Sequence, residues 1–454
     1  MNVHVTDSEM YKDLYGNEKI RHCFSDEDLL RQWIAIEVAL AQAQAELGII
    51  PYEAFEEIKR KGKIENFDME RIRKGITDTS HPLISFIRMF EELCDENYGE
   101  YVHYGATTQD IMDTGLILQL KNGYEYITQQ MNDTMNVLFK RIKETRDVPM
   151  AGRTHGQHAL PITLGFKLAT WLAEFQRHAL RLEQLRCRVF VGQLGGAVGT
   201  LASLEQEDGL KVQKRVMEIL RLENPSITWH SSRDNLVELA SVYAMISGTI
   251  GKIANEIINL QRTEIGEIEE GFESGKVGSS TMPHKRNPMN CEYIVGLSRL
   301  VRLQMSTVYD TLVQEHERDM GLWLVEWELW PEISIYTSKL LSDITMVVKN
   351  MIVNEANIKN NLHLTNGFIV SERMMFKLSP FVGKQTAHDI VYEICMEAYD
   401  NNERVIDAFL RDEIVRKHMS EVQIKETLNP ENYLGFSKQY VDNVLRNYEE
   451  WVNK

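Results

Sequence analysis

The sequence is poor in cysteine, and the cysteines it has show no pattern. Five cysteines are scattered over 454 residues, with no Cys-x-x-Cys pair and no Cys/His spacing of the kind found in zinc sites. A scattered, odd-numbered set does not suit a disulfide framework. We therefore expect buried, reduced thiols and no structural metal.

Positive charge is also in short supply. Lys and Arg number 50 against 67 Asp and Glu, which gives a net charge of -17 at pH 7. Because nucleic-acid binding depends on an excess of positive charge, we expect no nucleic-acid partner. An anionic ligand would have to be bound by a local cluster of Arg, Lys and His.

Long apolar runs are missing as well. The sequence has no run of about 18 apolar residues, the length that crosses a membrane, and residues 1–7 lack the basic segment and apolar run of a signal peptide. We therefore expect a soluble, cytoplasmic protein with no membrane partner. A chain of 454 residues exceeds one ordinary core, so two or three domains are expected.

Proline is rare, and its spacing leaves room for very long helices. There are ten prolines, and none falls within residues 83–148, 162–224 or 226–282. Within 234–270 apolar residues recur at steps of three and four: Leu236, Leu239, Val242, Ile246, Ile250, Ile253, Ile257 and Leu260. Such a stripe predicts a helix packed in a bundle. Because alternating strand patterns are nearly absent, the fold class should be all-α.

Local signals place the other helices. Residues 25–28 read Ser-Asp-Glu-Asp, a good N-cap run for a helix over 29–47, and further helices are expected over 52–61 and 83–96. Capping residues at 107–110 predict a helix from residue 111, and another long helix should begin near Pro161. An Asn-Pro-Glu-Asn-Tyr-Leu-Gly turn at 429–435 should precede the last helix.

Residues 275–288 form the most distinctive stretch. Two glycines and two prolines exclude a regular helix or strand. The stretch contains hydroxyls at Ser279 and Ser280, cations at Lys285 and Arg286, and the amide of Asn287. Hydroxyls, backbone N–H groups and a lysine together suit an anionic ligand. A solvated basic turn would have the same composition, so this stretch alone leaves both interpretations open.

A resemblance favours the ligand-binding interpretation. Residues 278–288, reading Gly-Ser-Ser-Thr-Met-Pro-His-Lys-Arg-Asn-Pro, resemble the signature of the fumarase/aspartase superfamily, in the form found in adenylosuccinate lyases and bacterial carboxymuconate cycloisomerases. That superfamily moves a proton at the carbon beside a carboxylate. The resemblance implies that Ser279 is the general base, that Lys285 and Asn287 hold the substrate carboxylate, and that Ser280 and Met282 also contact the substrate.

The residue types suit this chemistry. Removing a proton beside a carboxylate creates an aci-carboxylate dianion, which fixed cations and hydrogen-bond donors must stabilise. A serine is a poor base at its ordinary pKa. It becomes a plausible one where nearby cations favour the alkoxide and water is excluded.

Two further stretches resemble motifs of the same superfamily. Tyr-Gly-Ala-Thr-Thr-Gln-Asp at 104–110 is similar to its Gly-x-Thr-Ser-x-Asp motif, which implies that Thr107 and Thr108 bind the fumarate part of the substrate. Gly-Arg-Thr-His-Gly-Gln-His at 152–158 is similar to its Thr-His-Gly segment. This implies that His155, expected at a helix N-terminus, is the general acid, with Glu292 as its carboxylate partner. Capped, solvent-facing loops are the alternative for both.

Three more candidates come from single positions. His81 stands where adenylosuccinate lyases have an acid/base histidine in an Arg-His-Asp segment, but its neighbours here are Ser80 and Pro82, and a solvated histidine before a helix is the alternative. Arg233, before the striped helix, is expected to be an inward, substrate-facing cation. Residues 316–319 resemble the family's His-Glu-Arg-Asp motif, which implies that Arg318 contacts the distal part of the substrate.

One departure from the family bears on substrate size. Adenylosuccinate lyases continue with a Ser-Ser-Ala-Glu-Arg run that binds the nucleotide phosphate, whereas residues 323–327 here read Trp-Leu-Val-Glu-Trp. Desolvating a phosphate against Trp323, Leu324 and Trp327 would be costly. We therefore expect a substrate smaller than a nucleotide, and a lyase that eliminates fumarate from a succinylated amino acid or thiol by C–N or C–S cleavage.

The resemblance also implies an architecture and leaves alternatives. It implies an all-α subunit with three helical domains, over 1–106, 107–361 and 362–454, the central one a long-helix bundle. It further implies a homotetramer with shared active sites, a small dicarboxylate substrate, and neither metal nor cofactor. The alternatives are an adenylosuccinate lyase, a carboxymuconate cycloisomerase and an inactive structural homologue.

Overall fold

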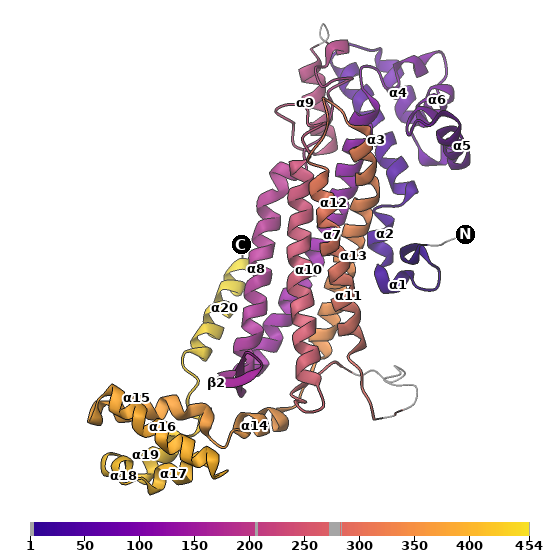
Figure 1. Cartoon of the computed structure of the whole chain (residues 1–454). Coiled ribbons are helices and arrows are strands. Elements are labelled where there is room, and N and C mark those ends of the chain that lie inside the picture. The colour runs from indigo at the N-terminus through magenta and orange to yellow at the C-terminus, as the bar shows by residue number, and fades with distance from the viewer. Residues whose placement is uncertain (1–3, 205–207, 272–281, 283, 454) are drawn as a thin grey trace. The chain divides into compact units, whose positions relative to one another are not determined.

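The computed structural model confirms an all-α chain (Figure 1). It describes residues 4–204, 208–271, 282 and 284–453. Short strands in these residues form a β1–β2 sheet and a β3–β4 sheet, both antiparallel. The expected helix over 52–61 is confirmed residue for residue, and the one over 29–47 is confirmed as Asp26–Glu46.

Most of the longer elements are α-helices. They are α1 (Lys12–Tyr15), α2 (Glu18–His22), α3 (Asp26–Glu46), α4 (Tyr52–Lys61), α5 (Met69–Thr79), α6 (Ile84–Leu93), α7 (Thr108–Thr145), α8 (Leu164–Val189), α9 (Gly209–Leu220), α10 (Asp234–Gln261), α11 (Met289–Leu303), α12 (Met305–Asp310), α13 (Met320–Asn350), α14 (Glu355–His363), α15 (Ser371–Val382), α16 (Lys384–Asp400), α17 (Val405–Arg411), α18 (Glu413–His418), α19 (Glu421–Thr427) and α20 (Ser437–Val452).

The remaining elements are short. The 3-10 helices are η1 (Val5–Asp7), η2 (Ile64–Asn66), η3 (Tyr98–Tyr101), η4 (Ala202–Leu204), η5 (Phe368–Val370) and η6 (Pro430–Asn432). The strands are β1 (Pro149–Thr154), β2 (Gln157–Thr163), β3 (Ile268–Glu269) and β4 (Ile352–Val353).

The chain divides into two compact units. Unit 1 comprises Met1–Met131, His178–Gly248 and Gly296–Leu341, and unit 2 comprises Asn132–Arg177, Thr249–Val295 and Ser342–Lys454. The three-domain boundaries expected after residues 106 and 361 remain a prediction.

Unit 1 has an aromatic core around α3. Ser25 caps this helix by accepting from the backbone N–H of Asp28, as its sequence predicts. The buried face of α3 meets α4, and α6 adds Phe86 and Phe90, which contact Phe67. Figure 1 shows α4, α5 and α6 gathered beside one another. This core holds the loop that leads into α7.

Unit 2 contains the hairpin β1–β2 and a cluster of short helices. The helices α15 to α19 pack together around a core that includes Met374 and Phe409 (Figure 1). Strand β1 contacts α14, and Ala151 of β1 belongs to the same core. The turn expected at 429–435 is confirmed, with η6 inside it and α20 following.

The predicted apolar stripe is confirmed as the buried face of α10. Each of its members, from Leu236 to Leu260, is buried. Among the described residues α10 is the one helix long and apolar enough to cross a membrane, but 67% of its most apolar window is buried inside the protein, which suits a core helix. The helix ends at Gln261, before the expected limit of 270, because residues 262–266 form turns and β3 follows.

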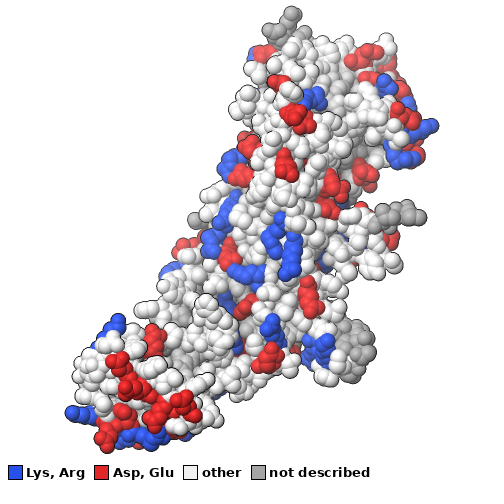
Figure 2. All heavy atoms as spheres, in the orientation of Figure 1, with Lys and Arg blue, Asp and Glu red and all other residues white. Residues whose placement is uncertain are grey.

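Two other expectations need correction. The long helix expected near Pro161 begins at Leu164, because Pro161 lies in β2, where it pairs with Ala151. The five cysteines are free, as expected, but Cys187 is exposed and only Cys291 is fully buried. On the face drawn in Figure 2, acidic and basic side chains of the described residues are interspersed.

Candidate active site

Unit 1 brings together three of the motifs at the start of α7. Nη1 of Arg318 donates to Oγ1 of Thr107 over 2.8 Å, and Nε of Arg318 donates to the side-chain oxygen of Gln109 over 3.1 Å. Oγ1 of Thr108 lies 3.4 Å from Nε2 of His81. Residues 81, 107–108 and 318 are distant in sequence, so only the fold brings these side chains into one corner.

The hydrogen bonds of His81 fix its tautomer. Its Nδ1 accepts from the backbone N–H groups of Leu83 and Ile84, at 3.3 and 3.1 Å, and so caps the start of α6. An accepting Nδ1 carries no proton, and the neutral ring therefore carries its proton on Nε2, facing Thr108. In this arrangement His81 is a hydrogen-bond donor. The acid/base role expected for His81 stays a prediction.

A buried carboxylate, Asp110, organises the same corner. It accepts four hydrogen bonds, from the backbone N–H groups of Thr107, Gly195 and Gly196 and from Nε2 of His230, at 2.9 to 3.0 Å. Consecutive backbone N–H groups form an anion site, and here the protein's own carboxylate fills it. The loop that contains Gly195 and Gly196 is thereby fixed against Thr107.

Arg233 points inward as expected, but its charge is already neutralised. It is 1% exposed and donates through Nε, Nη1 and Nη2 to the carboxylates of Asp113 and Glu326. Burial opposes the charge, but the two carboxylates outweigh it and raise the pKa of Arg233. The expectation that Arg233 faces the substrate is therefore corrected: it links α10 with α7 and α13 inside unit 1.

The indoles that replace the phosphate-binding residues also lie in this network. Nε1 of Trp323 donates to Oδ1 of Asp113 over 2.9 Å, and its ring meets Trp327 edge to face with ring centroids 5.2 Å apart. Trp323 is buried, whereas Leu324 is exposed. The single polar hydrogen of Trp323 is therefore already used and cannot bind a ligand.

In unit 2, His155 occupies the tip of the β1–β2 hairpin. Thr154 pairs with Gln157, and His155 and Gly156 form the two-residue turn between them, with φ of 54° and 76°. Positive φ at both turn positions is the geometry that fits the twist of a hairpin. The expected helix N-terminus at His155 is therefore wrong, because β2 intervenes before α8. His155 is exposed in the single chain.

An ion pair anchors this hairpin close to its tip. Arg153 binds the buried carboxylate of Glu267 through Nη1 and Nη2, at 2.9 and 2.6 Å. His158, which pairs with Arg153 across the ladder, has its pKa lowered, first by burial and then by the neighbouring guanidinium. His158 therefore tends to remain neutral beside Arg153.

The signature stretch is only partly described. Ser279 and Ser280 lie outside the described residues. Met282 and Lys285 are exposed, and the backbone N–H of Lys285 donates to the carbonyl of Met282 over 3.0 Å. Asn287 is half-buried. The structure therefore describes the cationic end of the stretch and says nothing of its serines.

The helix that follows, α11, carries Glu292. Its first turn is capped by the carboxylate of Glu270, which accepts from the backbone N–H groups of Asn290 and Cys291, at 3.3 and 2.9 Å. Glu292 itself is exposed, as is His155. Their expected partnership stays a prediction.

Sequence reasoning missed the buried residues that hold these groups. Asp110 was counted only as part of a helix start, and Glu267, Glu270 and His230 were not singled out. A buried carboxylate leaves no local signal beyond an acidic residue within an apolar stretch, because its donors come from distant segments. Only the capping position of Asp110 could have drawn attention to it.

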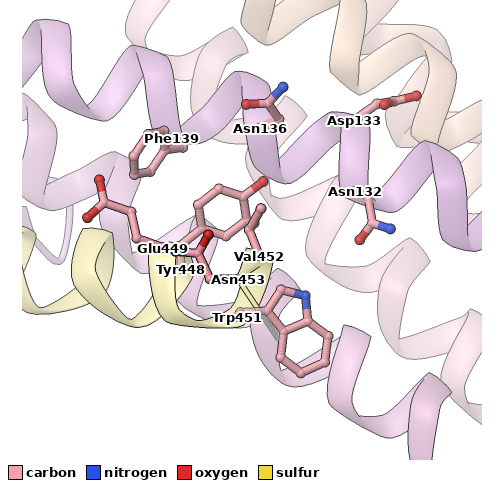
Figure 3. Close-up of a pocket in the computed structure, with 9 residues that line it drawn as sticks. All are labelled: Asn132, Asp133, Asn136, Phe139, Tyr448, Glu449, Trp451, Val452 and Asn453. Atoms are coloured by element: carbon pink, nitrogen blue, oxygen red, sulfur yellow. The ribbon is translucent and has the colours of Figure 1, made fainter.

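A pocket in unit 2 lies apart from these motifs. It has a volume of about 620 Å³ and lies between α7 and α20, where Phe139 and Tyr448 face one another (Figure 3). Its other lining residues are Asn132, Asp133, Asn136, Glu449, Trp451, Val452 and Asn453. None of these belongs to the motifs, so we do not place the active site there.

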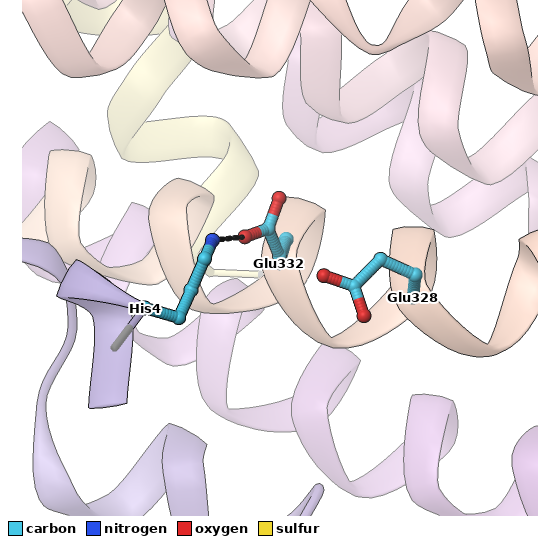
Figure 4. A group of neighbouring side chains, drawn as sticks. All are labelled: His4, Glu328 and Glu332. Carbon is cyan, nitrogen blue, oxygen red and sulfur yellow. Dashed lines mark ion pairs between the residues drawn. The ribbon is translucent and has the colours of Figure 1, made fainter. Parts of the chain in front are cut away.

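Unit 1 also has one group of possible metal ligands among the described residues: His4, Glu328 and Glu332 (Figure 4). Nε2 of His4 lies 3.3 Å from Oε1 of Glu332. That oxygen also accepts from the hydroxyl of Tyr336 over 3.0 Å, and Oε2 accepts from Gln304. His4 and Glu328 are exposed, and we interpret the group as a surface hydrogen-bond network.

Comparison with known proteins identifies the family. The profile of a family described as lyase matches residues 14–303, and that of the adenylosuccinate lyase C-terminus matches residues 367–444. The chain belongs to this lyase family, within the fumarase/aspartase superfamily.

Individual members of the lyase family resemble the chain over nearly its whole length. An N-acetyl-S-(2-succino)cysteine lyase of Enterococcus italicus is 41% identical over 98% of this chain and 97% of its own. An adenylosuccinate lyase of Methanocaldococcus jannaschii is 40% identical over 95% and 94%. The crystal structure of a 3-carboxy-cis,cis-muconate lactonizing enzyme from Pseudomonas putida matches with a TM-score of 0.92 at 32% identity, over 98% and 100%.

Proposed function

We propose that the chain eliminates fumarate from a succinyl thioether of an N-acylated cysteine. The observation that carries this proposal is the corner formed by Arg318, Thr107, Thr108 and His81. Two adjacent hydroxyls beside a guanidinium suit the carboxylate of a succinyl group. The 41% identity to an N-acetyl-S-(2-succino)cysteine lyase supports the thioether as the substrate class.

The proposed reaction consists of two proton transfers and one bond cleavage. Ser279, as an alkoxide, removes a proton from the carbon beside a succinyl carboxylate, and Lys285 and Asn287 stabilise the resulting dianion. The C–S bond then breaks with its electron pair going to sulfur. His155 donates a proton to that sulfur. The products are fumarate and the free thiol, and the cycle requires no cofactor or metal.

The aromatic residues of α13 support a substrate without a phosphate. Trp323 has already used its N–H on Asp113, and Trp327 packs against its ring. A phosphate placed there would lose water and gain no donor from Trp323. An N-acylated cysteine carries an amide and a carboxylate in place of a phosphate, so it needs fewer hydrogen-bond donors from the protein than a nucleotide does.

We propose further that the site is shared within a homotetramer. His155 and Glu292 are both exposed and unpaired with each other within one chain, so their partnership would come from a neighbouring copy. In unit 1, Leu303 of α11 and Val313 after α12 are 72% and 73% exposed, which suits a covered apolar face. Light scattering coupled to gel filtration tests the assembly; a monomer at micromolar concentration would refute it.

The experiment is a comparison of four substrates, followed through the ultraviolet absorbance of fumarate. They are N-acetyl-S-(2-succino)cysteine, S-(2-succino)cysteine, an N-succinyl amino acid and adenylosuccinate. We expect the fastest release from the first. Release from adenylosuccinate alone would refute the proposal and favour an adenylosuccinate lyase. One such enzyme is 40% identical to this chain.

The Ser279→Ala variant tests the assignment of the base. It should bind substrate but release fumarate at least about a hundredfold more slowly. Activity equal to that of the parent would remove Ser279 from the mechanism. If the parent releases no fumarate from any of the four compounds, two alternatives remain: conversion of 3-carboxymuconate would identify a cycloisomerase, and its absence an inactive homologue.

A further inference from the structure

A buried, bidentate ion pair joins the hairpin that carries His155 to Glu267. The carboxylate of Glu267 is 0% exposed and the side chain of Arg153 is 16% exposed. Both oxygens of Glu267 bind the guanidinium, through contacts of 2.9 and 2.6 Å. Such a two-point contact fixes direction as well as distance.

Glu267 is itself held by three further hydrogen bonds within unit 2. Its backbone N–H donates to the carbonyl of Leu260, at the end of α10, over 2.9 Å, and its carbonyl accepts from the N–H of Asn354 over 3.0 Å. Its side chain also accepts from Nδ2 of Asn361, on α14, over 2.9 Å. These hydrogen bonds fix the position of the Glu267 carboxylate, and Arg153 attaches the hairpin to it.

Strand β1 is fixed against α14 just before Arg153. Ala151 packs into the core with Leu362 of α14, and the ladder with β2 shifts its register between Ala151 and Arg153. Between them, a Cβ on Gly152 would lie 2.6 Å from the carbonyl oxygen of Leu160, so the strands approach too closely there for any other residue. His155 follows at the tip.

The segment that contains Glu267 also holds the helix of Glu292. Strand β3 connects Glu267 to Glu270, whose carboxylate caps α11 at Asn290 and Cys291. Four consecutive residues, 267–270, therefore bind both the hairpin and the start of α11. The proposed acid and the helix bearing a proposed carboxylate are attached to one short segment.

We propose that Arg153 and Glu267 are positioning residues for the proposed general acid: their ion pair orients the hairpin so that the His155 ring protonates the leaving atom. This inference rests on the proposed fumarate-releasing function. It assigns Glu267 no contact with the substrate. Loss of the pair should impair the step that needs the acid and leave substrate binding nearly unchanged.

The test uses Glu267→Gln with Glu256→Gln as its matched control. Glu256 forms another ion pair of unit 2, with Lys167 at 2.5 Å, and those side chains are 33% and 16% exposed. Each variant is assayed on two S-succinyl thioethers, one releasing N-acetylcysteine and one releasing thiophenol. An arylthiolate leaves readily without a proton, whereas an alkylthiolate needs the acid.

We expect Glu267→Gln to lower kcat about tenfold or more for the N-acetylcysteine adduct, and less than about threefold for the thiophenol adduct, with KM changed less than about threefold. Glu256→Gln should affect both adducts alike and weakly. Amide hydrogen exchange in β1 and β2 should be faster in Glu267→Gln than in Glu256→Gln.

A loss in Glu267→Gln that is equal for both leaving groups, or no loss, would overturn the inference. If that variant does not fold, the double variant Arg153→Met/Glu267→Met takes its place. It removes both charges, so neither is left unpaired in the interior. It should show the same dependence on the leaving group. If the wild type releases no fumarate from either thioether, the proposed function fails, which is a different outcome.

Discussion

Arg318 donates through Nη1 to Oγ1 of Thr107 over 2.8 Å, so the threonine proton points away from the guanidinium. A hydroxyl has one proton and two acceptor lone pairs, so an oxygen that accepts from a guanidinium is free to donate elsewhere. Thr107 thus has a hydrogen-bond donor left for water or for a ligand, and a carboxylate is the acceptor that binds such a donor most strongly.

Removing that donor should weaken substrate binding. Thr107→Val keeps the shape of the side chain, loses the hydroxyl and leaves Arg318 without this acceptor, so kcat/KM should fall by about 10- to 100-fold, corresponding to a hydrogen bond to a charged group. Initial rates of fumarate release measure the effect. Thr107→Ser keeps the hydroxyl and should stay within about threefold of wild type. An equal loss in both variants would mean that the methyl group, not the hydroxyl, matters.

The two histidines of the candidate site should respond differently to asparagine. Asparagine tolerates the positive φ of His155 and keeps the hairpin turn, but it supplies no proton, so His155→Asn should lower kcat by about 10²- to 10⁴-fold. In His81→Asn the amide oxygen can still accept from the N–H groups of Leu83 and Ile84, and the loss should stay below about tenfold. Steady-state kinetics on one substrate compare the two. The reverse order would make His81 the proton-transferring residue.

Asp110 should be a determinant of stability as well as of site geometry. Asp110→Asn replaces one accepting oxygen by an NH₂ group that faces backbone donors, so the free energy of unfolding should fall by about 2–4 kcal/mol. Urea unfolding of the variant measures this. The matched control is Asp95→Asn, at an exposed carboxylate that pairs with Arg60 and Lys61, and it should match wild type within error. Equal stability of both variants would contradict the role of Asp110.

His103 should make the stability of unit 1 depend on pH. Burial alone would lower its pKa, but the buried carboxylate of Glu37, 2.7 Å from Nδ1, raises the pKa above the ordinary 6.5. The extra stability from this pair is therefore complete below pH 6.5 and is lost as the pH rises through the raised value.

His103→Asn keeps a residue that tolerates the positive φ at this position and removes the titration. Thermal unfolding of both proteins between about pH 6 and pH 9 measures the difference, because the relevant window lies above the ordinary histidine pKa. The stability advantage of the wild type should shrink as the pH rises. An advantage that grows with pH would mean that His103 is neutral in the folded state.

Local signals in the sequence predicted secondary-structure elements better than they predicted tertiary contacts. The cap at Ser25 and the apolar stripe from Leu236 to Leu260 gave α3 and α10, because capping and periodicity act over a few residues. The hairpin at His155 was missed because its strands are short and one of them contains Pro161, which reads locally as a helix start. Strand pairing depends on the partner strand, and no single window of sequence contains it.

The sequence by itself determined the helical class, the motifs and the superfamily, since helix periodicity and loop chemistry reside in consecutive residues. Only the tertiary structure decided what each polar side chain binds. Asp110 gathers donors from three segments, Arg233 is neutralised by Asp113 and Glu326, and Glu267 anchors the hairpin. The physical reason is that a buried charge persists only with partners, and those partners come from wherever the whole chain folds back upon itself.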